Sequence, residues 1–266
     1  MVKIGFCADF RNHEQLRTLA EIGAEFVELN FLMLSEASDG EIAAAAKLLR
    51  ELHLPVLSYN GMLPWDLHVN GEHKDFARVD RYLARTLRRV ACLGGKNVVF
   101  GSSRSRSLDG DNTRENAYAE MTEFLRDHVA PAFALAGYTC TVETLSECEL
   151  VHTVEDGMEL VTAAARPEIG LLIDYYHTAA NGEDMHDLTR YAPHLYHTHI
   201  AALNSRAYPQ ASDPDDYVGI FRELNRIGYT GGVSVEAVPA KGVAFADAAR
   251  EAYNTLAAAR AAAESH

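Results

Sequence analysis

Short apolar, β-branched segments alternate with longer segments of helical periodicity along the whole chain. The predicted strands cover residues 3–8, 26–29, 55–59, 97–100, 139–143, 169–173, 195–199 and 232–236. The predicted helices cover residues 12–22, 39–52, 74–93, 112–136, 153–165, 184–191, 214–227 and 244–262, with a break near Pro131. Strict alternation of strand and helix is typical of a parallel sheet, so eight such pairs predict an α/β fold, a single closed (β/α)8 TIM barrel.

An open, doubly wound sheet is the alternative architecture for alternating strands and helices. That fold would place a glycine-rich turn after the first strand, whereas residues 8–14 read ADFRNHE. No linker or low-complexity segment divides the chain, so one domain is predicted over residues 1–266. The longest loops, at 60–74, 101–112 and 200–214, all follow strands and should lie on the face where barrel enzymes carry their active sites.

Composition narrows the classes of partner. The 266 residues are 48% hydrophobic and carry a net charge of −14, which disfavours nucleic acid and anionic membranes but permits a small anionic substrate. No apolar run approaches about 18 residues, so no transmembrane helix and no membrane partner are expected. The first residues lack the pattern of a signal peptide, and the four cysteines show no paired short spacing. A cytoplasmic protein with reduced thiols is therefore predicted.

Four predicted strands in the second half of the chain each end in a potential metal ligand. These residues are Glu143, Asp174, His199 and Glu236. Because the ends of neighbouring parallel strands converge, the four side chains predict a divalent-cation site. Carboxylates with a single imidazole suit Mn²⁺ or Mg²⁺, and Co²⁺, Zn²⁺ or Fe²⁺ are also compatible. Each residue taken alone could equally cap a strand or form an ion pair, and His197 lies on the same strand face as His199.

Several fragments resemble the xylose isomerase-like TIM-barrel superfamily. They are VETLSECE (142–149), LLIDYYH (171–177), YHTHIA (196–201) with NSR (204–206), and GYTGGVSVE (228–236). The similarity is greatest to the sugar isomerase and epimerase branch, which includes ketose 3-epimerases and hydroxypyruvate isomerases. It implies that the same four residues bind the metal, with His199 preferred to His197. It also implies substrate contacts from His177, Glu149, Arg206 and Arg106. The last of these ends the run FGSSRSR (100–106), which is similar to the FGS…R loop of the family.

Other polar side chains could line the same site. Asp9, Glu28 and Asn60 follow or end the first three predicted strands, and Trp65 lies on the long loop after the third. A role in supporting the ligands, or in capping and packing, fits each of them equally well. For His177 and Arg206 the alternatives are a hydrogen bond to a backbone carbonyl and an ordinary solvated charge.

The resemblance implies an isomerase or epimerase that uses a divalent metal. Such an enzyme would act on a small keto-sugar, sugar phosphate or hydroxy-keto acid through an enediolate, with Glu143 and Glu236 as acid and base. A lyase of the inosose dehydratase kind would use the same ligands but lose water. A nuclease similar to AP endonucleases is disfavoured by the charge of −14, and a non-catalytic barrel by the complete ligand set. The expected partner is a carbohydrate, and a homo-oligomer is compatible with the sequence.

Overall fold

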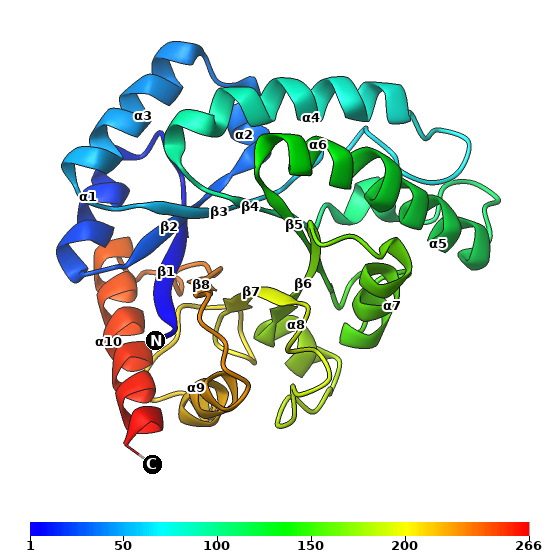
Figure 1. Ribbon diagram of the computed structural model, residues 1–266. Coiled ribbons are helices and arrows are strands. Elements are labelled where there is room, and N and C mark those ends of the chain that lie inside the picture. The colour runs from blue at the N-terminus through cyan, green and yellow to red at the C-terminus, as the bar shows by residue number, and fades with distance from the viewer. Residues whose placement is uncertain (266) are drawn as a thin grey trace.

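Eight parallel strands close into a barrel in the computed structural model, which describes residues 1–265 (Figure 1). The strands are β1 (Lys3–Ala8), β2 (Phe26–Asn30), β3 (Val56–Asn60), β4 (Asn97–Phe100), β5 (Thr139–Glu143), β6 (Ile169–Asp174), β7 (Leu195–Ile200) and β8 (Gly232–Val235). Each strand pairs with the next along the chain, and β1 pairs with β8 to complete the ring. The predicted (β/α)8 barrel is therefore confirmed.

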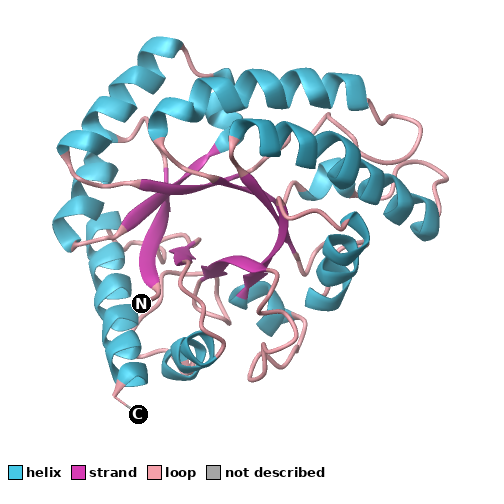
Figure 2. Cartoon of the chain, in the orientation of Figure 1, coloured by secondary structure: helices cyan, strands magenta, loops and turns pink. Residues whose placement is uncertain are grey.

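Helices surround the ring of strands (Figure 2). They are α1 (His13–Ile22), α2 (Phe31–Glu36), α3 (Asp39–Glu51), α4 (Phe76–Val90), α5 (Arg114–Glu123), α6 (Ala130–Ala136), α7 (Val154–Ala164), α8 (Tyr175–Ala180), α9 (Tyr217–Arg226) and α10 (Phe245–Glu264). The 3₁₀ turns η1 (Ala91–Leu93) and η2 (Ser103–Arg106) and the π turn η3 (Phe124–Val129) add to them. Within residues 1–265, no helix combines the length and apolar character needed to cross a membrane.

The predicted helix at 184–191 is wrong, because the chain is non-helical from 181 to 194. The helix that follows β6 instead begins at once, as α8. Asp174 caps it by accepting hydrogen bonds from the backbone N–H groups of Tyr176 and His177. The cap therefore holds the carboxylate of Asp174, at the end of β6, close to His177 in the first turn of α8.

The predicted break near Pro131 is also wrong. The chain stays helical from α5 through η3 into α6, with the proline near the start of α6. The wider π turn before it lets the helix continue although proline has no N–H to donate. A further helix, α2, was not predicted. It starts because the side chain of Asn30 accepts a hydrogen bond from the backbone N–H of Met33.

The barrel interior is polar where the strands approach their carboxyl ends. Glu28 on β2 hydrogen-bonds to His197 on β7 and to Ser234 on β8. Because β2 and β7 are not neighbours in the sheet, these bonds must cross the inside of the barrel. Alternate residues such as Val27 and Leu29 are fully buried in the hydrophobic core. The period of two along each strand thus separates an apolar face from a polar lining.

Candidate metal centre

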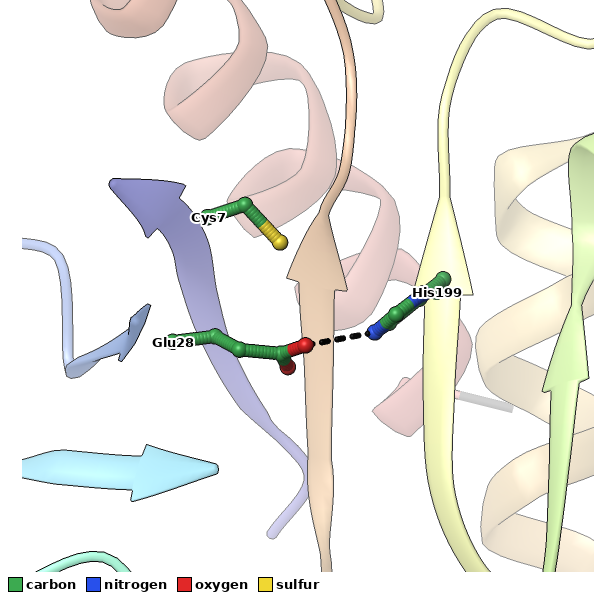
Figure 3. Close-up of side chains that lie close together, drawn as sticks. All are labelled: Cys7, Glu28 and His199. Carbon is green, nitrogen blue, oxygen red and sulfur yellow. Dashed lines mark hydrogen bonds and ion pairs between the residues drawn. The ribbon is translucent and has the colours of Figure 1, made fainter. Parts of the chain in front are cut away.

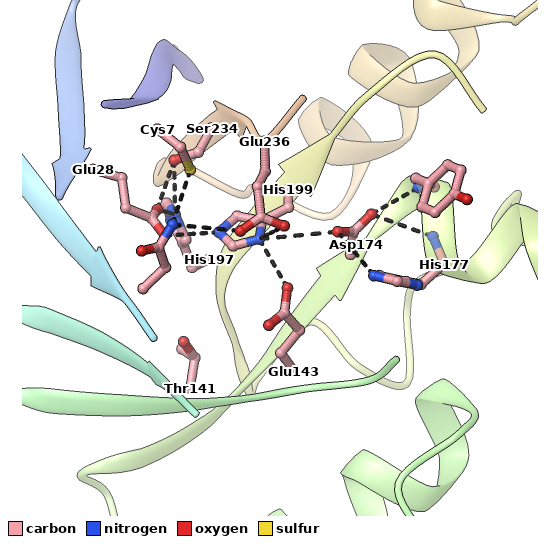
Figure 4. A network of polar contacts seen from close by, with 12 residues as sticks. Cys7, Glu28, Thr141, Glu143, Asp174, His177, His197, His199, Ser234 and Glu236 are labelled. Carbon is pink, nitrogen blue, oxygen red and sulfur yellow. Dashed lines mark hydrogen bonds and ion pairs between the residues drawn. The ribbon is translucent and has the colours of Figure 1, made fainter. Parts of the chain in front are cut away.

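Four side chains meet at the carboxyl ends of β5 to β8. Glu143 ends β5, Asp174 ends β6, His199 lies near the end of β7 and Glu236 follows β8. Each offers one ligand atom, and these atoms all lie within 4.8 Å of one another (Figure 4). The structure therefore brings together the four residues that the sequence predicts as ligands.

One nitrogen of His199 faces all three carboxylates. Its Nδ1 lies 2.9 Å from Glu143 Oε1. The same nitrogen lies 3.7 Å from Glu236 Oε2 and 4.0 Å from Asp174 Oδ2. Three carboxylate oxygens around one imidazole nitrogen form the kind of mixed oxygen and nitrogen donor set that divalent first-row metals accept.

The buried carboxyl groups of this cluster favour a positive charge placed among them. Burial, and then the neighbouring Glu143 and Glu236, raise the pKa of Asp174 to about 7. Burial also raises the pKa of Glu143. Burial alone would lower the pKa of His199, but the surrounding carboxylates, Glu28 first, raise it well above its ordinary value. Burial and mutual repulsion thus oppose ionisation of these carboxyl groups, and a divalent cation among them would offset both effects, so the donor set fits one.

His197 occupies a different place from His199. Its Nε2 lies 2.6 Å from Glu28 Oε2 and 3.0 Å from the hydroxyl of Ser234. These partners hold the His197 ring inside the barrel and outside the group of four. The geometry thus agrees with the sequence-based preference for His199.

A second group of potential ligands lies beside the first. Cys7, Glu28 and His199 also offer atoms within 4.8 Å of one another, with Cys7 next to the Glu28–His199 pair (Figure 3). Burial, reinforced by the nearby carboxylates, raises the pKa of the Cys7 thiol well above its ordinary value. A thiol that keeps its proton is a poor ligand, so this group suits a divalent metal less well.

His177 reaches the cluster from the first turn of α8. Its Nδ1 accepts a hydrogen bond from the backbone N–H of Ser146 at 3.2 Å and lies 3.4 Å from Glu147 Oε2. Burial lowers the pKa of His177 to about 4, so the ring is neutral and carries its proton on Nε2. That nitrogen is buried, lies 3.9 Å from Asp174 Oδ2 and has no hydrogen-bond partner among residues 1–265. It is therefore a free donor beside the cluster.

Arg206 borders the cluster on the loop after β7. Its Nη2 donates to Glu236 Oε2 at 3.0 Å, and its guanidinium lies 5.3 Å from the centre of the Tyr176 ring. The backbone of Arg206 adopts a φ of 56°, which is uncommon for a residue with a side chain. Asn60 approaches Glu236 from β3, with its Nδ2 3.4 Å from Oε1. Both oxygens of Glu236 are thus held in place.

A sequence profile of the xylose isomerase-like TIM barrel family matches residues 16–259. The chain belongs to this family. A search of curated proteins finds no significant match. Among solved structures, a D-psicose 3-epimerase in the presence of D-fructose is similar, with a TM-score of 0.84, 20% identity, and coverage of 98% of this chain and 99% of the other.

Two further solved members of the same fold are similar over nearly their whole length. An L-ribulose 3-epimerase has a TM-score of 0.82 and 21% identity, covering 100% of this chain and 96% of the other. The 3-keto-D-glucoside 4-epimerase YcjR from E. coli has a TM-score of 0.81 and 20% identity, covering 97% and 100%. At such identities the likeness establishes the fold alone.

The resemblance to the xylose isomerase-like family also implied substrate contacts from Glu149 and Arg106, and within the described residues neither side chain hydrogen-bonds to the four residues of the cluster. Glu149 is exposed, and within the described residues no hydrogen bond or ion pair joins its side chain to the four. Glu147, two residues earlier, lies against His177 instead. Both glutamates belong to the sequence Glu-Cys-Glu and both are exposed, so spacing alone could not show which of them lies against His177.

Arg106 is almost completely buried, at 1% exposure. Its Nη1 donates to the backbone carbonyl of Phe100 at 3.3 Å, and its guanidinium lies 5.4 Å from the centre of the Phe100 ring. Its Nη2 lies 3.9 Å from Cys148 Sγ, and among residues 1–265 its Nε has no hydrogen-bond partner. Arg106 thus supports the loop after β4, and the structure records no contact between it and the four residues of the cluster.

Gly101 lies in close contact with Glu143. The sequence did not predict it as a site residue. A Cβ atom built on this residue would lie 2.1 Å from Glu143 Oε2. Real contacts of Cβ atoms are never so short, so only glycine leaves room for the carboxylate in its present position. The glycine in FGSSRSR was the available signal, but its relation to Glu143 depends on the pairing of β4 with β5.

Proposed function

We propose that the protein is a divalent-metal-dependent isomerase or epimerase. Its substrate is a small keto-sugar, sugar phosphate or hydroxy-keto acid, and the reaction passes through an enediolate. The observation that carries this proposal is the convergence of Glu143, Asp174, His199 and Glu236 within 4.8 Å. The similarity of the fold to three sugar epimerases supports the same reaction class.

These four residues would hold the cation, with Mn²⁺ the first candidate and Mg²⁺, Co²⁺, Zn²⁺ or Fe²⁺ as alternatives. The cation would stabilise negative charge that develops on substrate oxygens when a neighbouring carbon loses its proton. A carboxylate alone is too weak a base to create that charge in the absence of such stabilisation.

Glu143 and Glu236 are the residues that would move the proton. They come from β5 and β8, so they approach His199 from different directions (Figure 4). A base on one side of a planar enediolate and an acid on the other are what inversion at carbon requires. Return of the proton to the adjacent carbon by the same carboxylate would instead produce an isomerisation.

His177 and Arg206 would orient the reacting groups. The free Nε2–H of His177 can donate to a substrate oxygen, because its other nitrogen already accepts from Ser146. Arg206 holds Glu236 through a hydrogen bond of 3.0 Å and so fixes the direction in which this carboxylate presents its oxygens. Arg206 would also contact the substrate, as the resemblance to the family implies, because its side chain is 40% exposed beside the cluster.

A product screen in D₂O tests the proposal. The purified protein would be incubated with ketoses, their phosphates and hydroxypyruvate in the presence of Mn²⁺, Mg²⁺ or Co²⁺, and the products read by NMR. Deuterium entering a carbon beside the carbonyl, together with an epimer or aldose, is the expected result. Loss of water would indicate a lyase, and absence of any exchange across the whole panel would contradict the proposed chemistry. Chelator-treated protein is the control.

A further inference from the structure

Glu28 is a fully buried carboxylate inside the barrel, directly beside the proposed ligands (Figure 4). Its Oε1 lies 3.0 Å from Nε2 of His199. Its Oε2 lies 2.6 Å from Nε2 of His197 and 2.8 Å from the hydroxyl of Ser234. Both oxygens therefore have hydrogen-bond donors, and the proposed function gives this residue no task.

The two ring nitrogens of His199 face different surroundings. Nε2 faces Glu28, and an ionised carboxylate can only accept a hydrogen bond, so Nε2 must carry a proton. Nδ1 faces the group of three carboxylates, with Glu143 Oε1 at 2.9 Å. Without a cation, this hydrogen bond holds a proton between Nδ1 and Glu143. A cation bound among the carboxylates would displace that proton, so Nδ1 is the ring nitrogen whose lone pair a cation can use.

We propose that Glu28 is a positioning residue for the metal centre, which fixes His199 in the Nε2–H form and so presents Nδ1 to the cation. This inference rests on the metal dependence proposed above. A histidine that binds a metal gains a defined ring orientation and a more basic nitrogen when its other N–H is bonded to a carboxylate. Glu28 supplies that carboxylate from β2, on the far side of the barrel from β6.

The hydrogen bond between Glu28 and His199 also indicates which of the two groups of potential ligands would bind the cation. A cation held by Cys7, Glu28 and His199 would need the Nε2 lone pair and an oxygen of Glu28. Both are already used in the hydrogen bond between them. The cation should therefore bind on the Nδ1 side only, with one site per chain.

Cation binding to purified, chelator-treated protein tests the inference. The Glu28→Met variant keeps the length of the side chain but removes both acceptors, and should bind Mn²⁺ about 10–100-fold more weakly in calorimetry. Glu28→Gln retains one acceptor oxygen and should recover part of that loss. Glu223→Met is the matched control, because Glu223 is a buried glutamate that bonds to Arg226 and to the backbone of Leu188, away from the site. Its Mn²⁺ affinity should equal that of the wild type.

A second measurement needs no variant of Glu28. Long-range ¹H–¹⁵N correlations of the Mg²⁺-loaded wild type should show His199 with a proton on Nε2 and none on Nδ1. A proton on Nδ1, or an unprotonated Nε2, would overturn the inference, as would a Glu28→Met variant that binds Mn²⁺ within twofold of the wild type. Wild-type protein that binds no divalent cation would instead refute the proposed function.

Discussion

The substitution Gly101→Ala tests the placement of Glu143 without changing any charge. The added Cβ would lie 2.1 Å from Glu143 Oε2, whereas ordinary van der Waals contacts of this kind begin near 3.4 Å. The carboxylate oxygen would have to retreat by more than about 1 Å, which far exceeds the tolerance of about 0.2 Å on metal–ligand distances. The φ of Gly101 lies outside the left-handed region, so alanine adds no backbone strain.

We expect Gly101→Ala to weaken Mn²⁺ binding by at least about tenfold, in the range found when the support of a metal ligand is removed. Turnover should fall with it. Stability of the cation-free protein should change little, because the atom in conflict is the end of a flexible side chain and can move. Calorimetric titration with Mn²⁺, turnover on any substrate found by the D₂O screen, and thermal unfolding would measure the three quantities.

Gly40→Ala is the matched control for this experiment. Gly40 is exposed in α3, and a Cβ there would meet only Ser38 Oγ at 4.0 Å. Its Mn²⁺ affinity should match that of the wild type. If Gly101→Ala also retained wild-type affinity and turnover, then Glu143 would not need its observed position, and the reasoning about the four-residue centre would be refuted.

Four further predictions follow from the same structure. Glu143→Gln and Glu236→Gln should each retain the fold, by circular dichroism, and lose turnover by orders of magnitude; full activity in either would remove that residue from the mechanism. His177→Leu should lower kcat/KM by about 10–100-fold, the loss of one hydrogen bond to the substrate, and leave Mn²⁺ affinity unchanged in calorimetry. Because the folded-state pKa of Asp174 is raised from 3.8 to about 7, the folded protein keeps a proton that the unfolded chain has already lost, so the contribution of Asp174 should lower the Tm of cation-free protein as the pH rises from about 4 to about 7 and should level off above that; Mn²⁺ should suppress that fall. Ser38→Ala removes the cap that accepts from the Glu41 N–H, and should cost about 1 kcal/mol in denaturant unfolding with turnover intact.

The strands were predictable because their pattern is local. Each observed strand agrees with its predicted range to within one residue at either end, since a buried parallel strand is a short β-branched apolar run. The helix after β6 was not predictable in the same way. Periodicity favoured 184–191, but the cap formed by Asp174 starts α8 nine residues earlier, at Tyr175. The two hydrogen bonds accepted by one capping side chain thus placed this helix where the periodicity did not.

The site was predictable only where it lies at strand ends. The ends of β5 to β8 converge in any closed barrel, so Glu143 and Asp174 could be placed from the sequence. Glu147 and Gly101 lie in or next to loops, whose direction depends on packing that no local pattern records. Glu28 was recognised as a possible pocket residue, but its partner His199 lies 171 residues away, and their contact exists only after the ring closes.

Closure of the ring by β1 and β8 also sets when the proposed activity can arise during synthesis. A nascent polypeptide leaves the ribosome amino-terminal end first. Strand β1 therefore cannot pair with β8 until almost the entire chain has been synthesised. All four proposed ligands lie at the ends of the last four strands to emerge. A truncated translation product that lacks β8 would therefore expose two unpaired strand edges prone to aggregation, rather than retain a weakened catalyst.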